Sequence, residues 1–298
     1  MRLVTYSLRG TRRLGVWIDE GIVDVPEAIG HPAFPTTMEA LIQRNGGTVL
    51  DAVQEALEKP DVLEYVVPRA KLLVPLLPSS LRDFLAFEDH VKAGAKRRKT
   101  TVPDVWYEMP IYYKGNHRSV IGPGATVEWP TFTEKLDYEC EVAAVVGKHG
   151  RDLTAKQAER AIFGYTLMND WSARDIQARE MQGWLGPAKG KDFATSLGPC
   201  IVTADELDVP GVDLVARVDG EVWSKGSLEG MRWSYEEMVA HVSRSEDVYP
   251  GDVYGSGTFG GGCGLDQGRF LQPGQVVELE GSGLGVLRNR VGRIRRRD

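Results

Sequence analysis

The chain has 298 residues, of which 42% are hydrophobic and 26% charged, and its formal net charge is −6 at neutral pH. This composition argues against extensive disorder and collagen-like repeats, and the negative charge argues against a nucleic-acid binder, whose affinity comes from neutralising phosphates. No segment has the roughly 18 consecutive apolar residues of a membrane span, and the N-terminus lacks a signal-peptide apolar region, so we expect a cytoplasmic protein with no membrane partner.

Residues 1–75 are predicted to form a small N-terminal α/β domain. Apolar and polar residues alternate from Arg2 to Val25, as in short antiparallel strands joined by glycine-containing turns. From Thr37 to Leu57 the apolar residues follow a helical period that Gly46-Gly47 interrupts, which indicates one or two helices. A proline-rich connector follows, and residues 76–298 are predicted to form the second, larger domain.

The second domain is predicted to be mainly β with a few short helices. Its clearest strand runs from Tyr138 to Val146, where strict alternation puts Glu139 and Glu141 on one face and Tyr138 and Cys140 on the other. The signals for the remaining elements are a capping box at Thr154 with its helix closing at Gly164, a hairpin at Asp219-Gly220, a second capping box at Ser234 with a helix to about Ser243, and strands at Val276–Leu279 and Gly285–Val291.

Three cysteines, two basic clusters and two irregular segments complete this survey. Cys140, Cys200 and Cys263 are far apart and odd in number, which predicts free thiols in a reducing compartment rather than disulfides or a zinc site. The basic clusters Lys96–Lys99 and Arg293–Arg297 are interpreted as solvated segments. Two segments without periodicity are candidates for a lid, namely residues 93–104 and 182–191.

Glu139 and Glu141 form the most unusual local pattern in the sequence. Two carboxylates two residues apart on one strand face stand about 7 Å apart at their Cα atoms, close enough to hold one cation. A hard divalent cation with oxygen ligands would relieve their mutual repulsion. The alternative is an edge strand with one solvated face, and the spacing alone leaves both open.

Asp170 is a third candidate ligand. It follows an apolar, strand-like run and precedes a predicted helix on whose face Asp170, Arg174 and Gln177 would lie together at positions i, i+4 and i+7. A carboxylate at this junction is suited to metal binding, but the alternative is that Asp170 or Ser172 simply caps the helix N-terminus. Spacing does not separate the two interpretations.

Three ordered segments carry a resemblance to a known family. They are the run from Asp137 to Gly147 (DYECEVAAVVG), the run from Met168 to Gln177 (MNDWSARDIQ) and the run from Gly190 to Thr195 (GKDFAT). From about residue 80 to 298 the sequence therefore resembles the fumarylacetoacetate hydrolase family. The resemblance implies a rolled mixed β-sheet around the active site, a divalent cation (Mg²⁺ first, Mn²⁺ or Ca²⁺ otherwise) and a homodimer. Members hydrolyse C–C bonds of diketo acids, or decarboxylate, hydrate or isomerise related 2-oxo acids.

The resemblance assigns expected roles to individual residues. The expected metal ligands are Asp83, Glu139, Glu141 and Asp170, with Asp83 identified by its seven-residue offset from His90. His90 is the expected general base, and Lys191 the expected catalytic cation beside the substrate oxygen. The expected substrate contacts are Tyr113, Arg174, Gln177 and Thr195.

One member of the family's catalytic pair is missing from the matched motifs. In the family the histidine is paired with a glutamate, either three residues later or in the C-terminal glycine-rich loop. Here Ala93 stands three residues after His90, and the loop Gly257–Gly264 contains no acid. Nearby substitutes are Glu88, Asp89 and Asp266, and the motif assigns none of them.

These observations predict a metal-dependent hydrolase acting on a C–C bond of a small acidic 1,3-diketo or acylpyruvate-type compound. A cation chelated by such a substrate stabilises the enolate that bond cleavage leaves, and a histidine is suited to activate water near neutral pH. The same enolate chemistry without water attack gives the alternatives: an oxaloacetate-like decarboxylase, a hydratase or an isomerase. A third, least favoured interpretation is a non-catalytic binding protein on this fold.

Overall fold

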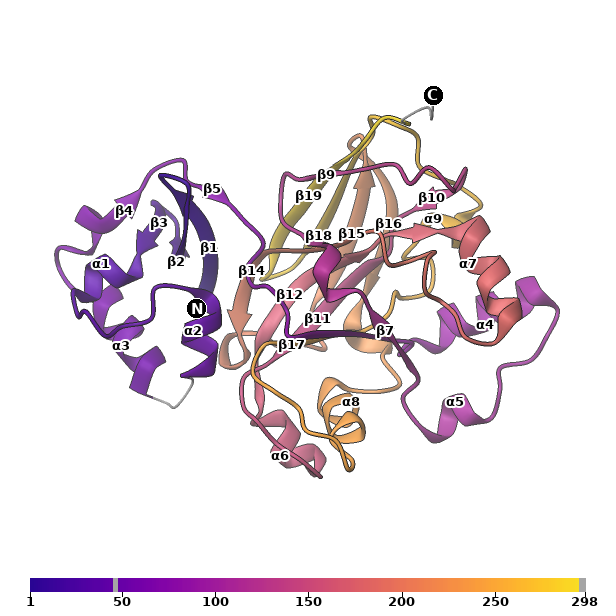
Figure 1. Cartoon of the computed structure of the whole chain (residues 1–298), viewed down its shortest axis with the longest axis horizontal. Helices are drawn as coiled ribbons and strands as arrows, with labels where there is room; N and C mark the ends of the chain where they lie inside the picture. The colour runs from indigo at the N-terminus through magenta and orange to yellow at the C-terminus, as the bar shows by residue number, and fades with distance from the viewer. Residues whose placement is uncertain (45–47, 295–298) are drawn as a thin grey trace.

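The computed structural model describes residues 1–44 and 48–294. Its main feature is a 12-stranded mixed sheet that extends from one lobe of the molecule to the other. Its order is β4-β3-β2-β1-β14-β12-β11-β17-β6-β7, with β5 paired to β1 and β8 to β14. The N-terminal strands form one lobe and the later strands the other (Figure 1). The sheet passes between the lobes through the antiparallel pairing of β1 with β14, in which Leu3 lies opposite Ile201.

The strands are β1 Arg2–Leu8, β2 Thr11–Ile18, β3 Gly21–Asp24, β4 Val66–Val67, β5 Lys71–Leu72, β6 Ser80–Phe84, β7 Tyr112–Gly115, β8 Val120–Ile121, β9 Thr126–Val127, β10 Leu136–Asp137, β11 Cys140–Val146, β12 Ile162–Asp170, β13 Ser172–Ala173, β14 Thr195–Thr203, β15 Asp213–Val218, β16 Glu221–Ser227, β17 Asp252–Gly255, β18 Val276–Gly281 and β19 Gly285–Val291. The helices are α1 Val25–Ile29, α2 Met38–Gln43, α3 Thr48–Leu57, α4 Glu88–Arg98, α5 Val105–Glu108, α6 Ala155–Glu159, α7 Arg174–Glu180, α8 Tyr235–Val242 and α9 Gly264–Gln267. These mixed sheets with short helices confirm the predicted fold class. Within the described ranges, no helix is both long and apolar enough to cross a membrane.

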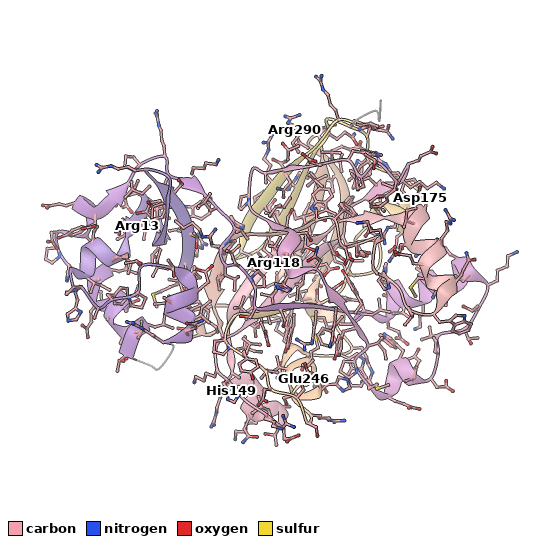
Figure 2. The ribbon with its side chains drawn as sticks, viewed as in Figure 1. Arg13, Arg118, His149, Asp175, Glu246 and Arg290 are labelled. Carbon is pink, nitrogen blue, oxygen red and sulfur yellow. The ribbon has the colours of Figure 1, made fainter. Side chains whose placement is uncertain are left out.

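The N-terminal lobe contains the predicted elements. Strands β1, β2 and β3 form an antiparallel meander, and α2 and α3 occupy the stretch whose helical period was predicted. The predicted break at Gly46-Gly47 lies outside the described residues. Arg13, labelled in Figure 2, donates to both carboxylate oxygens of Asp24, which also accepts the hydroxyl of Tyr6, so this buried carboxylate has its hydrogen-bond partners.

Strand β11 is central rather than at an edge, because it lies between β12 and β17. Every residue of the strand is buried. Its two faces join different parts of the core: Cys140, Val142 and Ala144 pack on one side, and Ala143 and Val145 on the other. The predicted alternation is therefore confirmed, and the alternative of a solvated edge face is wrong.

A second sheet of five strands, in the order β16-β15-β18-β19-β9, packs near β12 and β14. The predicted hairpin joins β15 to β16, with Asp219 at φ 50° and Gly220 at φ 83°, as a type I′ turn requires. Both capping boxes are present, at Thr154 and Ser234. The three cysteines are free and buried.

Three predicted helix boundaries or loops differ from the structure. Helix α6 ends at Glu159, and Gly164 belongs to β12, which lies so close to β14 that a Cβ atom at residue 164 would stand 2.2 Å from the Val202 carbonyl oxygen. Asp170 ends β12 and α7 starts only at Arg174, so Asp170 neither shares that helix face nor caps the helix. The predicted irregular segment 93–104 begins as the second half of α4.

Candidate active site

Four carboxylates meet where β6, β11 and β12 bring their side chains together. Asp83, Glu139, Glu141 and Asp170, called here the carboxylate cluster, each offer an oxygen within 4.8 Å of the others, and all four are buried. Asp83 comes from β6 and Glu141 from β11, while Glu139 precedes β11 and Asp170 ends β12. The structure therefore brings together all four predicted metal ligands.

Gly255 makes room for this cluster. It lies on β17, between β6 and β11, and pairs with Asp83 on one side and Ala143 on the other. A Cβ atom at this position would stand 2.5 Å from Asp83 Oδ1 and 3.0 Å from Glu141 Oε2. The middle strand must therefore carry a glycine for carboxylates from both neighbouring strands to converge.

The buried carboxylates of the cluster repel one another when they are ionised. Burial, reinforced by the charges of neighbouring carboxylates, raises the pKa values of Asp83, Glu141 and Asp170 above their usual range. Glu139 behaves differently: burial works to raise its pKa, but Lys191 and Arg174 overcome this effect and lower it to about 2. Three of the four groups thus favour a proton, or a cation in its place.

The cluster fits a hard divalent cation. Both Glu141 carboxylate oxygens and Asp170 Oδ1 are buried, and none has a hydrogen-bond donor among the described residues. Buried acceptors normally have a partner, and an all-oxygen donor set is the one that Mg²⁺, Mn²⁺ and Ca²⁺ prefer. The residues that would hold such an ion are the four of the cluster.

Two buried cations border the cluster. The Lys191 ammonium group donates to Glu139 Oε2 and to Asp170 Oδ2. Arg174, the first residue of α7, donates from Nη2 to Glu139 Oε1 at 2.9 Å and from Nε to Asp137 Oδ2 at 2.8 Å. Gly190 allows the loop to bring Lys191 this close, because a Cβ there would lie 2.8 Å from the Gln177 backbone nitrogen.

The predicted substrate-contacting residues surround the same cluster. Tyr113, opposite Asp83 on β7, donates its hydroxyl to Asp170 Oδ2 at 2.7 Å. Burial, with the nearby carboxylates, raises the pKa of Tyr113 well above its usual value, so the phenol remains a donor. Thr195 lies opposite Asp170 in the pairing of β12 with β14, and Gln177 accepts from Arg174 Nη1 at 3.0 Å.

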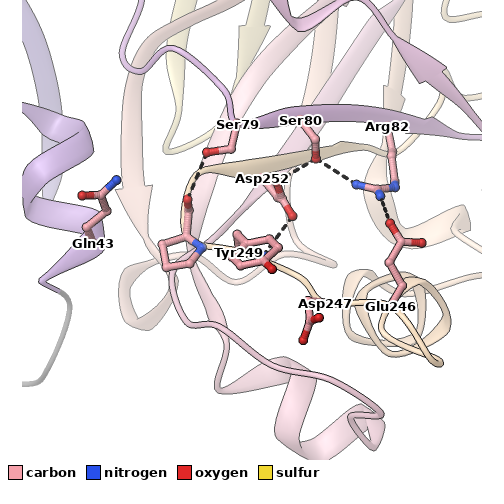
Figure 3. Close-up of a pocket in the computed structure, with 9 residues that line it drawn as sticks. Gln43, Ser79, Ser80, Arg82, Glu246, Asp247, Tyr249 and Asp252 are labelled. Atoms are coloured by element: carbon pink, nitrogen blue, oxygen red, sulfur yellow. Dashed lines mark hydrogen bonds and ion pairs between the residues drawn. The ribbon is translucent and has the colours of Figure 1, made fainter.

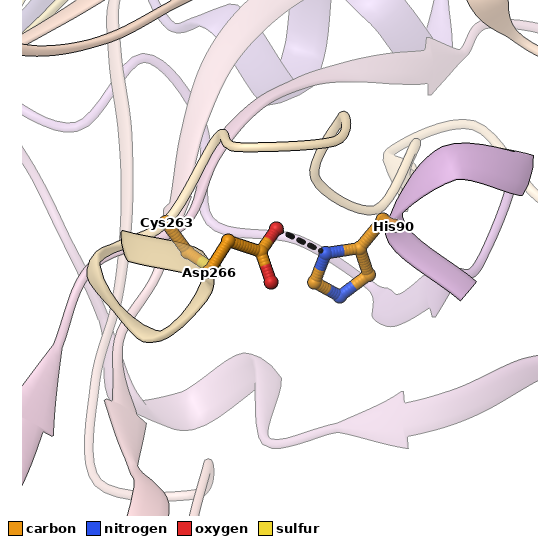
Figure 4. Close-up of side chains that lie close together, drawn as sticks. All are labelled: His90, Cys263 and Asp266. Atoms are coloured by element: carbon orange, nitrogen blue, oxygen red, sulfur yellow. Dashed lines mark hydrogen bonds and ion pairs between the residues drawn. The ribbon is translucent and has the colours of Figure 1, made fainter. Parts of the chain in front are cut away.

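His90 is paired with an acid that the sequence motif did not assign. His90 Nδ1 lies 3.0 Å from Asp266 Oδ2, and this acid–base pair joins α4 to α9 (Figure 4). Asp266 also accepts from the Gly261 backbone N–H at 2.9 Å and from Arg97 Nη1 at 2.5 Å. Burial works to raise the pKa of Asp266, but His90 and Arg97 lower it below its usual range, which keeps the carboxylate ionised.

Asp137 is a residue that sequence reasoning did not identify as a site residue. It is fully buried and accepts Arg174 Nε together with the backbone N–H groups of Gly264 and Leu265, which start α9. It therefore links the arginine beside the carboxylate cluster to the helix that carries Asp266. Its place in the DYECE run, at the period-2 position before Glu139 and Glu141, was the available signal.

A separate hollow of about 430 Å³ lies between α2 and the large lobe (Figure 3). Its buried Arg82 donates to Ser80 Oγ at 2.8 Å and pairs with Glu246. Arg82 precedes Asp83 on β6, and successive residues of a strand point to opposite faces. This hollow therefore belongs to the other face of β6 from the carboxylate cluster.

Comparison with known proteins agrees with this geometry. Residues 80–292 match the model of the fumarylacetoacetate (FAA) hydrolase C-terminal family. The chain therefore belongs to the fumarylacetoacetate hydrolase family.

The names of individual relatives refer to several different activities. The chain is 30% identical to oxaloacetate tautomerase Fahd2a, mitochondrial, of Rattus norvegicus, across 98% of this chain and 91% of the relative. It is 32% identical to the Homo sapiens protein of that name, across 87% and 81%. Among solved structures it resembles a fumarylacetoacetate hydrolase from Exiguobacterium antarcticum, with a TM-score of 0.77 and 28% identity over 98% of this chain and 99% of that one. It also resembles the 5-carboxymethyl-2-hydroxymuconate delta-isomerase of Mycobacterium smegmatis, with a TM-score of 0.72 and 26% identity over 98% and 100%.

Proposed function

We propose that this protein is a divalent-metal-dependent hydrolase that cleaves a C–C bond in a small acidic 1,3-diketo or acylpyruvate-type substrate. The observation that carries the proposal is the His90–Asp266 pair, which coexists with a buried four-carboxylate cluster in the same domain. A water-activating base and a cation site together are what hydrolysis at a carbonyl carbon requires. Tautomerisation needs the cation and a proton carrier, but no attacking water.

Asp83, Glu139, Glu141 and Asp170 would hold the cation, with Mg²⁺ the first candidate and Mn²⁺ or Ca²⁺ the others. When bound, such an ion polarises the oxygens of a 2-oxo acid or 1,3-diketone and stabilises negative charge that develops on them. Lys191 adds a fixed positive charge beside Glu139 and Asp170. It is suited to stabilise the oxyanion that forms on the substrate.

His90 is the general base of the proposed reaction. Its Nδ1 faces Asp266, so Nε2 is the nitrogen that remains to take a proton from water and later return it to the leaving carbon. Asp266 fixes the orientation of the ring and stabilises the imidazolium form, the role that the carboxylate of a catalytic triad performs.

The polar groups around the carboxylate cluster would orient the substrate. Arg174 and Gln177, bonded to each other on α7, offer a guanidinium and an amide to the acidic end of the substrate. Tyr113 and Thr195 are the proposed contacts of the substrate oxygens. Each role remains a prediction for mutagenesis.

The second candidate function is the keto–enol tautomerisation of an oxaloacetate-like acid. It is favoured by the names of the rat and human relatives, which are 30% and 32% identical over most of this chain. The same residues would act, with His90 moving a proton between carbon and solvent instead of activating water for attack. Decarboxylation of the same acid is the remaining alternative.

A substrate panel tests the proposal. We expect purified protein with Mg²⁺ to hydrolyse acylpyruvates or fumarylpyruvate, and we expect EDTA to abolish the reaction and added Mg²⁺ to restore it. The His90→Ala and Asp266→Asn variants should lose hydrolysis while binding Mg²⁺ as the wild type does. If oxaloacetate tautomerises or loses CO₂ and no acylpyruvate is cleaved, the hydrolase proposal is wrong. If no metal binds and no substrate turns over, the protein is a binding protein on this fold.

Two further properties are part of the proposal. We expect a homodimer, which sedimentation equilibrium measures directly. We also expect the protein to act in the cytoplasm, where its three buried thiols stay reduced, and imaging of the tagged protein tests this location.

A further inference from the structure

Helix α4 carries two side chains that reach the same carboxyl group. His90 and Arg97 are seven residues apart, about two helical turns, and therefore lie on the same face of α4. His90 Nδ1 lies 3.0 Å from Asp266 Oδ2, and Arg97 Nη1 lies 2.5 Å from Asp266 Oδ1. The two oxygens of one carboxylate thus connect the proposed base to an arginine further along its own helix.

Burial separates this ion pair from an ordinary surface pair. The Asp266 side chain is 5% exposed, whereas that of Arg97 is 36% exposed, so the guanidinium covers a carboxylate that water hardly reaches. Exposed ion pairs contribute little because water screens them, but a buried carboxylate depends on its partners. The rest of the basic run, Lys96, Arg98 and Lys99, is exposed, and the Arg98 guanidinium lies over Gly94 of the same helix.

We propose that Arg97 is a positioning residue for the acid–base pair, holding Asp266 in place and sharing its negative charge with His90. This inference rests on the proposed role of His90 and extends it to a residue outside the matched motifs. Aspartate is one methylene shorter than the glutamate expected from the family. It therefore needs donors on both oxygens to stay in reach of a ring on another helix, and Gly261 supplies the second donor to Oδ2.

The charge effect has a definite sign. Asp266 stabilises the imidazolium form of His90. Arg97 opposes this stabilisation because its positive charge partly neutralises the same carboxylate. The other charged groups near His90 include Glu139, which precedes β11 and is bonded to Lys191 and Arg174, and Asp89, its neighbour on α4. Removing the Arg97 charge leaves more of the negative charge of Asp266 to act on His90, so protonated His90 becomes more stable and the free base forms only at higher pH.

The test uses Arg97→Met with Arg98→Met as the matched control, because both changes remove one arginine from the end of the same helix. The first readout is the proton titration of the His90 ring in the Mg²⁺-loaded protein by NMR, with the signal assigned through a His90→Gln variant among the five histidines. We expect Arg97→Met to raise the titration midpoint by about 0.5–1 pH unit. We expect Arg97→Lys to recover at least half of that shift, and Arg98→Met to leave the midpoint at the wild-type value.

The second readout is the pH profile of kcat/KM on whichever substrate the protein turns over. Its acid limb should move to higher pH by the same amount in Arg97→Met, and its plateau should fall by about tenfold because Asp266 is held less firmly. Mg²⁺ affinity by calorimetry should stay within about twofold of the wild type, which shows that the variant is folded around the cluster. The proposal is overturned if Arg97→Met and Arg98→Met titrate alike, or if lysine rescues nothing in a folded protein. The NMR readout needs no turnover, so it decides the role of Arg97 even if the hydrolase proposal fails.

Discussion

Replacement of Glu141 by glutamine is expected to stabilise the metal-free protein and to remove most of the stabilisation that Mg²⁺ gives. Glu141 is the best residue for this change, because both of its oxygens lack a hydrogen-bond donor among the described residues. Glu139 is a poorer choice, since its removal would leave Lys191 and Arg174 without a shared partner. Glutamine keeps the shape of the side chain and removes its charge.

The expected magnitudes follow from the geometry. Carboxylate oxygens within 4.8 Å of one another repel by about 3–4 kcal/mol per ionised pair at an effective dielectric constant of 20. Proton uptake and Lys191 relieve part of this repulsion, so we expect Glu141→Gln to stabilise the metal-free protein by about 1–3 kcal/mol. At about 2 °C per kcal/mol for a chain of this size, Tm should rise by roughly 2–6 °C.

The stability gained from Mg²⁺ should be much smaller in the variant than in the wild type. Mg²⁺ at 100 times its Kd stabilises the wild type by about 2.7 kcal/mol, or roughly 5 °C. Loss of a residue that contacts the ion directly should weaken Mg²⁺ binding by at least about 100-fold. Replacing a group that only hydrogen-bonds to a metal ligand already costs about 10–100-fold. At the same Mg²⁺ concentration the variant then gains under about 0.5 kcal/mol.

The assay is differential scanning fluorimetry at pH 8 with EDTA and with Mg²⁺, supported by calorimetric titration. Glu159→Gln is the matched control, because Glu159 is an exposed carboxylate at the end of α6. A variant that is destabilised without metal and still gains the wild-type increment from Mg²⁺ would refute the assignment of the cluster as a cation site.

Three other predictions follow from the same site. Gly255→Ala should cost about 1–3 kcal/mol of stability and abolish Mg²⁺ binding, because its Cβ would overlap Asp83; unchanged Tm and calorimetry would contradict this. Without metal, the raised pKa values in the carboxylate cluster mean that the folded state binds more protons than the unfolded state above about pH 4. Stability should therefore fall from pH 5.5 to pH 8, and it should fall less in Glu141→Gln. A rise in Tm over that pH range in EDTA would contradict the raised pKa values of these carboxylates. Asp137→Asn should lower kcat/KM by about 10–100-fold while Mg²⁺ affinity changes by less than tenfold, because Asn cannot accept at both oxygens from Arg174 and the start of α9; wild-type kinetics would exclude the linking role.

Features governed by neighbouring residues could be predicted from the sequence alone. The alternation along residues 138–146 put Glu139 and Glu141 on the same side because the period of a strand is a local property. The two capping boxes and the Asp219-Gly220 turn are likewise decided by side chains within three or four residues of each other. The family motifs added the other two residues, Asp83 and Asp170, of the carboxylate cluster.

The other features of the site depend on the pairing of segments that lie far apart in the sequence. Spacing left open whether Asp170 caps a helix or joins a metal site, and the register of β12 against β14 decides that it ends a strand inside the carboxylate cluster. It also left open whether the β11 face is solvated, and the flanking strands β12 and β17 bury it. The partner of His90 stayed unassigned because Asp266 lies 176 residues away.

The sequence by itself determined the chemical groups that this protein has available and the strand face on which two of them lie. Only the tertiary structure decided how those groups combine. Gly255 has no side chain and so lets Asp83 and Glu141 converge from the two neighbouring strands, and the docking of α9 against α4 supplies the acid that the motif lacked. The physical reason is that burial and convergence depend on which strands and helices become neighbours, and that choice is made by the whole core rather than by any short segment.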